Sequence, residues 1–143
     1  DAWERGDRDM LNRVQAHQWL DGPRAQSGRV IGSVRELFLD MNAIALAKSR
    51  LTQEERPPVA WARMAEVGAP TLLLVGDEDF TALIDRHDHL SEEMPNAFAA
   101  VLEGVAHIPS IERPDLVNSM LLEFLDAIEG GDDEDESDED SED

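Results

Sequence analysis

Two side chains that could share a proton, Asp79 and His107, each follow a short apolar run of the chain. A histidine that acts as a general base needs a near-neutral pKa and one fixed tautomer. A buried carboxylate that accepts a hydrogen bond from Nδ1 fixes the tautomer and stabilises the imidazolium. Asp79 and His107 could therefore be two of the three members of a catalytic triad. No nucleophile to complete the triad is evident in the sequence.

The segments around this pair predict a strand–helix–strand unit. Residues 71–75 are apolar without alternation, which is typical of a strand buried on both faces of a parallel sheet. Residues 82–94 have helical periodicity, and residues 98–102 form a second short apolar run. Catalytic groups of such sheets gather at the carboxyl ends of the strands. We therefore expect Asp79 and His107, 28 positions apart, to meet at one edge of the sheet.

Helices are predicted before this unit. Asp7 or Asp9 can cap a helix that runs to about Leu20. Ser33 and Glu36 have the spacing of a capping box at the start of a second helix.

A loop over residues 51–60 and a short helix over 59–66 lead into the first strand. Pro114 is well placed to open a last helix after the second strand. The expected buried face of that helix consists of Val117, Met120, Leu121, Phe124 and Ile128.

The composition excludes several classes of protein. The chain has no cysteine, so it can form neither a disulfide nor a thiolate metal site. A net charge of -21 argues against binding to nucleic acid phosphates, and no apolar run is long enough to cross a membrane. We expect a cytoplasmic protein. Abundant acid with Lys48 as the only lysine is also typical of a halophile, although other acidic proteins share this balance.

The other histidines lie on predicted helices. His17 belongs to the first helix, and His87 and His89 belong to the helix between the two strands. Packing or surface exposure is the expected role of all three. For His17 and the nearby Trp19, the alternative is that they line a substrate pocket.

The residues around Asp79 and His107 resemble the C-terminal end of the α/β-hydrolase superfamily. Residues 70–79 read Pro-Thr-Leu-Leu-Leu-Val-Gly-Asp-Glu-Asp, like the family's Pro-Thr-Leu-Val-x-x-Gly-x-x-Asp. Residues 104–114 read Gly-Val-Ala-His-Ile-Pro-Ser-Ile-Glu-Arg-Pro, like the family's Gly-x-x-His-x-x-x-x-Glu-x-Pro. The first 60 residues resemble the helical cap of lactonase-like and C–C-hydrolase-like members.

The resemblance implies an α/β class of fold, namely a partial α/β-hydrolase fold in which a helical cap precedes a C-terminal βαβα unit of a parallel sheet. Residues 1–66 would be the cap or lid, 67–129 the C-terminal part of the core, and 130–143 a disordered acidic tail. It also implies that Asp79, rather than Asp77, is the acid of the triad and that His107 is the base.

The family's serine stands on a strand-to-helix elbow of Gly-x-Ser-x-Gly type, and the chain has no such motif. Ser33 opens a predicted helix, and Ser110 lies too close to His107 to be that serine. The chain thus resembles the C-terminal half of an esterase-like hydrolase. The whole enzyme would act on an ester, lactone or related carbonyl of a small-molecule substrate without a cofactor or metal. This chain alone would be inactive.

Other interpretations stay open. Haloperoxidase or dehalogenase chemistry is found on related folds, and the oligomeric state is unknown. A second class of function is a non-catalytic, truncated module that completes the sheet of a partner, because two parallel strands cannot satisfy their edges alone. A third, an acidic chaperone-like or cation-buffering protein, depends on the tail alone.

Overall fold

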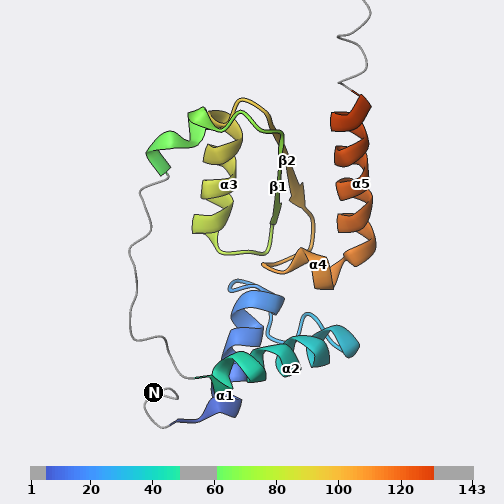
Figure 1. Cartoon of the computed structure of the whole chain (residues 1–143). Helices are drawn as coiled ribbons and strands as arrows, with labels where there is room; N and C mark the ends of the chain where they lie inside the picture. The colour runs from blue at the N-terminus through green and yellow to red at the C-terminus, as the bar shows by residue number, and fades with distance from the viewer. Residues whose placement is uncertain (1–5, 49–60, 131–143) are drawn as a thin grey trace, which may run out of the picture.

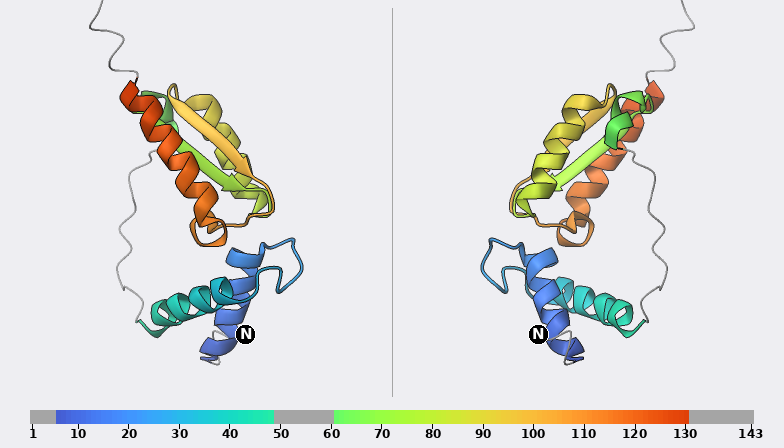
Figure 2. Two further views of the ribbon diagram at one scale, coloured as in Figure 1. Left: turned by 90° about the vertical axis from the view of Figure 1, so that its right-hand side faces the viewer. Right: turned by 90° about the vertical axis from the view of Figure 1, so that its left-hand side faces the viewer.

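The computed structural model describes residues 6–48 and 61–130, and it arranges them as helices on both sides of two strands (Figure 1). Helices α3 and α5 lie on opposite sides of the strands, and the N-terminal helices lie beyond the carboxyl ends of the strands (Figures 1 and 2). The elements in chain order are α1 (Arg8–Ala16), the π-helical turn η1 (His17–Asp21), α2 (Ser33–Ala47), the 3₁₀ helix η2 (Trp61–Glu66), β1 (Thr71–Gly76), α3 (Thr81–Glu93), β2 (Ala97–Leu102), α4 (Pro109–Glu112) and α5 (Pro114–Gly130).

The predicted strand–helix–strand unit is confirmed. Strands β1 and β2 pair in parallel, with Thr71 opposite Ala97 and Gly76 opposite Leu102. Helix α3 is the crossover between them, and α5 packs on the other side through an edge-to-face contact of Phe98 with Phe124. Both strands point toward the N-terminal helices, so the residues that follow them lie between the sheet and those helices (Figure 1).

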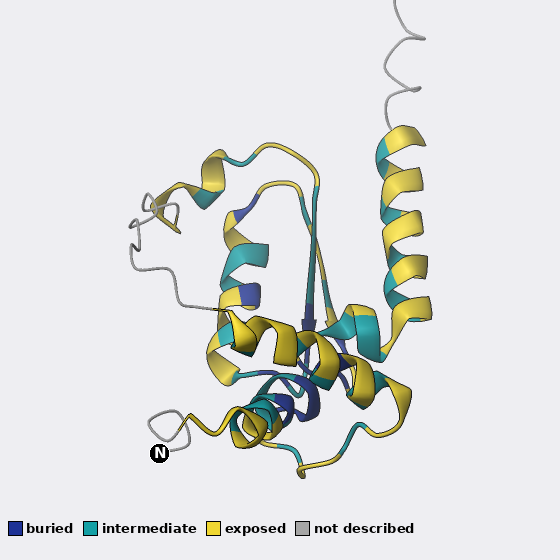
Figure 3. Ribbon diagram, turned by 60° about the horizontal axis from the view of Figure 1, so that its bottom comes forward, coloured by how far each residue is buried: buried dark blue, intermediate teal, exposed yellow. Residues whose placement is uncertain are grey.

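Many of the most deeply buried residues lie where η1 meets the carboxyl ends of the strands, shown in dark blue in Figure 3. Leu20 of η1 is fully buried, as are Val105 and Ala106 of the loop after β2. The faces of the sheet are less well covered, since Phe98 and Val101 of β2 remain about half exposed. Strand β1 was expected to be buried on both faces along its length, but only its last two residues, Val75 and Gly76, are buried.

The predicted buried face of helix α5 is wrong. The helix begins at Pro114 as expected, but none of its residues is buried, and Leu121 on the expected inner face is 44% exposed. The physical reason is the width of the sheet. Among the described residues the sheet has two strands, which do not cover the whole apolar stripe of a helix of this length.

The starts of the two N-terminal helices differ from each other. Asp7 caps α1 as predicted, because its side chain accepts a hydrogen bond from the N–H of Met10 at 2.9 Å. The capping box at Ser33 and Glu36 is wrong. Gly32 occupies the cap position with a φ of 71°, Ser33 is already the first residue of α2, and no side chain caps the helix.

Two expectations lie outside the described residues: the loop over 51–60 and the acidic tail after residue 130. Within residues 6–48 and 61–130, every helix is too short or too polar to cross a bilayer.

Gly76 allows β1 to end directly under the histidine loop, which consists of residues 103–112 and carries His107. A Cβ atom on Gly76 would collide with the carbonyl oxygens of Val105 and Ala106. Its φ is not positive, so the need for glycine comes from space and not from backbone conformation.

We expect Gly76→Ala to lower the free energy of unfolding by about 1–3 kcal/mol, because the histidine loop must move to admit the methyl group. Urea denaturation measures the loss. Gly68→Ala is the matched control, since nothing lies within 4 Å of a Cβ at that position. Equal losses in the two variants would contradict the steric argument.

Candidate active site at the carboxyl ends of the strands

Asp79 lies in the turn between β1 and α3, and only 3% of the residue is exposed. The turn is closed by a hydrogen bond from the N–H of Asp79 to the carbonyl of Gly76 at 3.2 Å. The N–H of Phe80 donates to Asp79 Oδ1 at 2.7 Å. The other carboxylate oxygen, Oδ2, lies 2.8 Å from Nδ1 of His107.

His107 is held by its backbone as well as by its ring. Its N–H donates to the carbonyl oxygen of Trp19 in η1 at 3.2 Å. Its side chain remains 40% exposed, whereas the side chain of Asp79 is 5% exposed. The pair thus consists of a buried carboxylate and an imidazole with an open face.

Asp77 lies two residues before Asp79 but serves a different purpose. Its Oδ1 accepts a hydrogen bond from the N–H of Gly104 at 2.7 Å, and its own N–H donates to the carbonyl of Leu102 at 3.1 Å. Asp77 therefore joins the end of β1 to the start of the histidine loop. The geometry brings Asp79, and not Asp77, to His107.

The arrangement allows acid–base chemistry at His107. An ionised Asp79 can only accept a hydrogen bond, so Nδ1 carries the proton in this pairing and Nε2 is left as the basic nitrogen. Among the described residues, no serine or threonine hydroxyl is hydrogen-bonded to His107. Those residues also contain no cluster of three or more His, Asp or Glu side chains that could hold a metal ion.

Trp19 forms one wall of the site. Its ring lies against Phe80 with 5.0 Å between centroids and against His107 with 4.6 Å. The sequence suggested pocket lining only as an alternative role for Trp19. Trp19 contacts His107, but it does not line the cavity next to the pair, so its role in a substrate pocket stays a prediction.

The remaining histidines lie elsewhere. His87 is buried on α3, with Nε2 3.3 Å from the carbonyl of Leu73, and His89 stacks on Trp61 with 4.9 Å between ring centroids. His17 lies in η1, where Nδ1 is 3.8 Å from Asp21 Oδ2. Among the described residues, none of these three histidines forms a hydrogen bond with Asp79 or His107.

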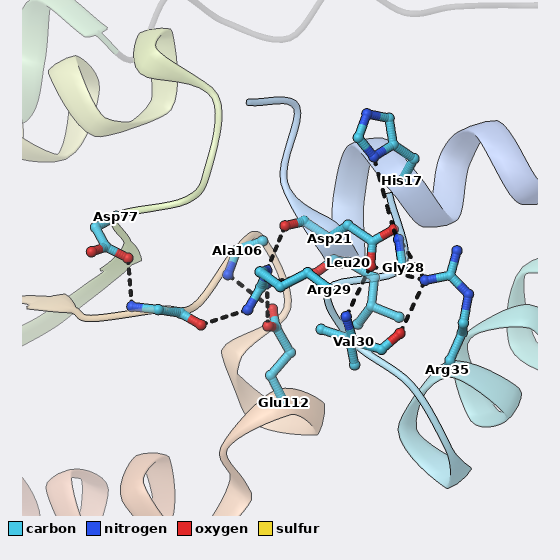
Figure 4. A network of polar contacts seen from close by, with 11 residues as sticks. His17, Leu20, Asp21, Gly28, Arg29, Val30, Arg35, Asp77, Ala106 and Glu112 are labelled. Atoms are coloured by element: carbon cyan, nitrogen blue, oxygen red, sulfur yellow. Dashed lines mark hydrogen bonds and ion pairs between the residues drawn. The ribbon is translucent and has the colours of Figure 1, made fainter. Parts of the chain in front are cut away.

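A network of charged residues lies beside the site, on the side of the N-terminal helices (Figure 4). Asp21 is completely buried at the end of η1, and Arg35 of α2 pairs with it at 2.8 Å. Arg29, in the loop between η1 and α2, pairs with Glu112 of the histidine loop at 2.6 Å. Sequence reasoning missed Asp21, Arg29 and Arg35, and it used Glu112 only as part of a motif.

The two buried acids of this network have opposite pKa shifts. Burial is the largest influence on the pKa of Asp21 and acts to raise it. The N–H groups of Gly28 and Val30, together with Arg35, outweigh burial, so the pKa of Asp21 lies below its ordinary value of 3.8. For Glu112, burial dominates and the hydrogen bond from Arg29 offsets it only in part, so the pKa of Glu112 is raised.

A cavity of about 290 Å³ adjoins the Asp79–His107 pair. Four leucines of β1 and α3 line it, and the polar groups come from Asp79, Arg86, His87 and His107. The cavity therefore extends from β1 and α3 to the acid–base pair.

Comparison with solved structures defines the class of fold. The structure of MenH from S. aureus matches 89% of this chain with a TM-score of 0.58 at 18% sequence identity, and the match covers 54% of the MenH chain. The chain thus has part of the α/β-hydrolase fold, as its motifs predicted. It consists of N-terminal helices followed by a βαβα unit.

Sequence comparison finds partial matches to curated hydrolases. The putative carbamate hydrolase RutD of Agrobacterium fabrum is 36% identical over 64 residues, which cover 45% of this chain and 24% of that protein. RutD of Pseudomonas savastanoi pv. phaseolicola is 35% identical over 66 residues, covering 46% and 26%. The chain thus matches about a quarter of the length of these curated relatives. No protein-family model matches it. The predicted resemblance to α/β-hydrolases is confirmed for this part of the chain.

We expect Asp21→Asn to lower the free energy of unfolding by about 3 kcal/mol near neutral pH, because Arg35 loses its buried, charged partner. The folded-state pKa of Asp21 lies below 3.8, so the stability contributed by the carboxylate is complete above pH 3.8 and is lost as the pH falls through the folded pKa. The difference between wild type and variant should therefore shrink below pH 3.8.

Urea denaturation at several pH values measures this difference. Asp85→Asn, on an exposed position of α3, is the control for removing one negative charge. A wild-type advantage over Asp21→Asn that stays constant to the lowest pH would contradict the assignment.

Proposed function

We propose that this chain supplies the acid and base of a serine hydrolase of the α/β-hydrolase type. The observation that carries the proposal is the hydrogen bond of 2.8 Å between Asp79 Oδ2 and His107 Nδ1, placed just beyond the carboxyl ends of two adjacent parallel strands. The relatives named as putative carbamate hydrolases support the same class of reaction. Residues 1–66 would form the cap, 67–129 the C-terminal part of the core, and 130–143 an acidic tail.

The proposed reaction takes place in two halves. In the first, His107 Nε2 accepts the hydroxyl proton of a serine as the serine oxygen attacks the substrate carbonyl. Asp79 holds the imidazole and stabilises its positive charge. His107 then gives the proton to the leaving group, which departs from the acyl-enzyme. In the second half, His107 activates a water molecule that releases the acyl group and restores the serine.

The serine of this mechanism would come from a segment outside the 143 residues. Ser33 begins α2 and Ser110 lies within α4, so neither stands on a strand-to-helix turn. In the part of the chain that the structure describes, β2 is the one strand paired with β1. The unpaired edge of β1 and the nearby cavity support this proposal, because a further strand paired with β1 would end beside the acid–base pair. The half-exposed leucines of α5 also need further sheet to cover them.

The substrate would be a small molecule with an ester-like carbonyl. That class includes esters, lactones and carbamates, all of which lose a leaving group from a tetrahedral intermediate. The triad itself needs no metal or cofactor to carry out these steps.

We expect the native protein that contains this chain to react with a fluorophosphonate probe and to hydrolyse a p-nitrophenyl ester. His107→Ala should lower kcat by about 10⁶-fold because it removes the base, and Asp79→Asn by about 10⁴-fold because it leaves the base in the wrong tautomer. Asp77→Asn is the matched control, because the amide oxygen can still accept the hydrogen bond from Gly104. The control should retain activity within a fewfold of wild type.

Peptide mapping of the labelled protein then locates the serine. A labelled serine on the same polypeptide would show that this chain is one part of the enzyme. A labelled serine on a separate, co-purifying polypeptide would favour a module that completes a partner's sheet. Absence of both labelling and hydrolysis would overturn the proposed function.

A further inference from the structure

Arg29 makes four hydrogen bonds that join the N-terminal helices to the histidine loop (Figure 4). On the helical side, Nε donates to the carbonyl of Asp21 at 2.6 Å, and a guanidinium NH₂ group donates to the carbonyl of Leu20 at 2.7 Å. On the other side, the guanidinium donates to the carbonyl of Gly104 and to Glu112 Oε2, both at 2.6 Å. Its side chain is 24% exposed.

The helical partners of Arg29 arise from the way the first helix ends. Residues of the last turn of a helix have carbonyl groups without partners in the helix, and the negative end of the helix dipole lies there. The π-helical turn η1 ends at Asp21, and Gly22 then leaves the helix with a φ of 97°. The guanidinium of Arg29 donates hydrogen bonds to two of these carbonyls, and its positive charge offsets the negative end of the helix dipole.

The other partners lie at the two ends of the histidine loop. Gly104 comes before His107 and Glu112 comes after it, so Arg29 holds the loop on both sides of the imidazole. Glu112 then reaches inward, because its Oε1 accepts a hydrogen bond from the N–H of Ala106 at 2.9 Å. A chain of contacts thus leads from Arg29 through Glu112 to the residue next to His107.

Arg29 also keeps Glu112 in place electrostatically. The side chain of Glu112 is 4% exposed, and a buried carboxylate without a cation is costly. Without Arg29, Glu112 would take up a proton or turn toward water. Either change would weaken its acceptance of the Ala106 N–H.

We propose that Arg29 is a positioning residue for His107. It fixes the histidine loop so that the imidazole stays aligned with Asp79, and it takes no part in proton transfer itself. This inference rests on the proposed hydrolase function, although its structural part can be measured without activity.

We expect Arg29→Met in the native protein to lower kcat for the p-nitrophenyl ester by about 10²-fold, because a small displacement of a catalytic group costs this much. KM should stay within about twofold, since Arg29 is not expected to contact substrate. Arg29→Lys should recover only a small part of the loss, because one ammonium group cannot reproduce the planar fork that reaches four acceptors.

Arg35→Met is the matched control. Arg35 has a similar exposure of 22% and also pairs with a buried acid, but its hydrogen bonds go to Asp21 and Val30 and not to the histidine loop. Arg35→Met should lower the stability while kcat at a permissive temperature stays within a fewfold of wild type. Equal losses of kcat in the two variants would overturn the proposal.

Two structural measurements test the role of Arg29 independently of the proposed hydrolase activity. Glu112 accepts through both carboxylate oxygens, so in Glu112→Gln the one remaining oxygen cannot serve both Arg29 and Ala106. Arg29→Met and Glu112→Gln should therefore speed hydrogen exchange of the Ala106 amide by about tenfold or more, and Arg35→Met should not. The downfield proton resonance of the His107–Asp79 hydrogen bond should broaden or disappear only in the first two variants. If Arg29→Met fails to fold, Glu112→Gln still tests the same chain of contacts, because it changes the partner that links Arg29 to Ala106.

The outcomes can be told apart. A wild-type protein without labelling or hydrolysis would disprove the hydrolase, while the exchange and resonance measurements would still test the role of Arg29 in the loop. Active protein with an unchanged resonance and unchanged exchange in both Arg29→Met and Glu112→Gln would disprove the positioning role alone.

Discussion

Three carboxylates are buried where the N-terminal helices meet the strand ends. The rest of the structure there depends on giving each carboxylate hydrogen-bond donors. An unpaired carboxylate in such a place costs several kcal/mol, so each needs hydrogen bonds, and two of the three also face a positive charge. Asp79 receives the imidazole of His107 and a backbone N–H, whereas Asp21 and Glu112 receive arginines. The same requirement that stabilises the junction also aligns the acid–base pair.

The choice of arginine follows from this requirement. The chain has a net charge of -21 and one lysine, so nearly all of its cationic side chains are guanidiniums. A guanidinium presents donors in a fixed plane and can bind several acceptors at once, which an ammonium group does less well. Arg29 uses this property on two carbonyls of η1 and on both ends of the histidine loop. Both cationic partners of the buried acids at this junction are accordingly arginines.

Sequence reasoning could predict the strand–helix–strand unit because its signals are local. The apolar run before Gly76 and the periodicity of α3 are set by neighbouring residues, and the order of the elements brings Asp79 and His107 to one edge. Preference for Asp79 over Asp77 came from a motif, and the geometry agrees because Asp77 is engaged with Gly104. Their catalytic roles remain a proposal.

The supporting network could not be predicted in the same way. Arg29 and Glu112 are 83 residues apart and lie in a loop and a single-turn helix, where no periodicity marks a partner. The π-helical turn that exposes the carbonyls for Arg29 also has no simple sequence signal. The cap at Ser33 failed for a related reason, since Gly32 can adopt a positive φ and take the cap position one residue earlier.

The separations of these contacts along the chain favour one order of assembly. The hydrogen bond between Asp79 and His107 closes a loop of 28 residues, and that between Asp77 and Gly104 closes one of 27. The contacts of Arg29 with Gly104 and Glu112 span 75 and 83 residues, and closing a longer loop costs more chain entropy. The strand–helix–strand unit can therefore form its acid–base pair first. The N-terminal helices then dock onto a histidine loop that already has its approximate shape.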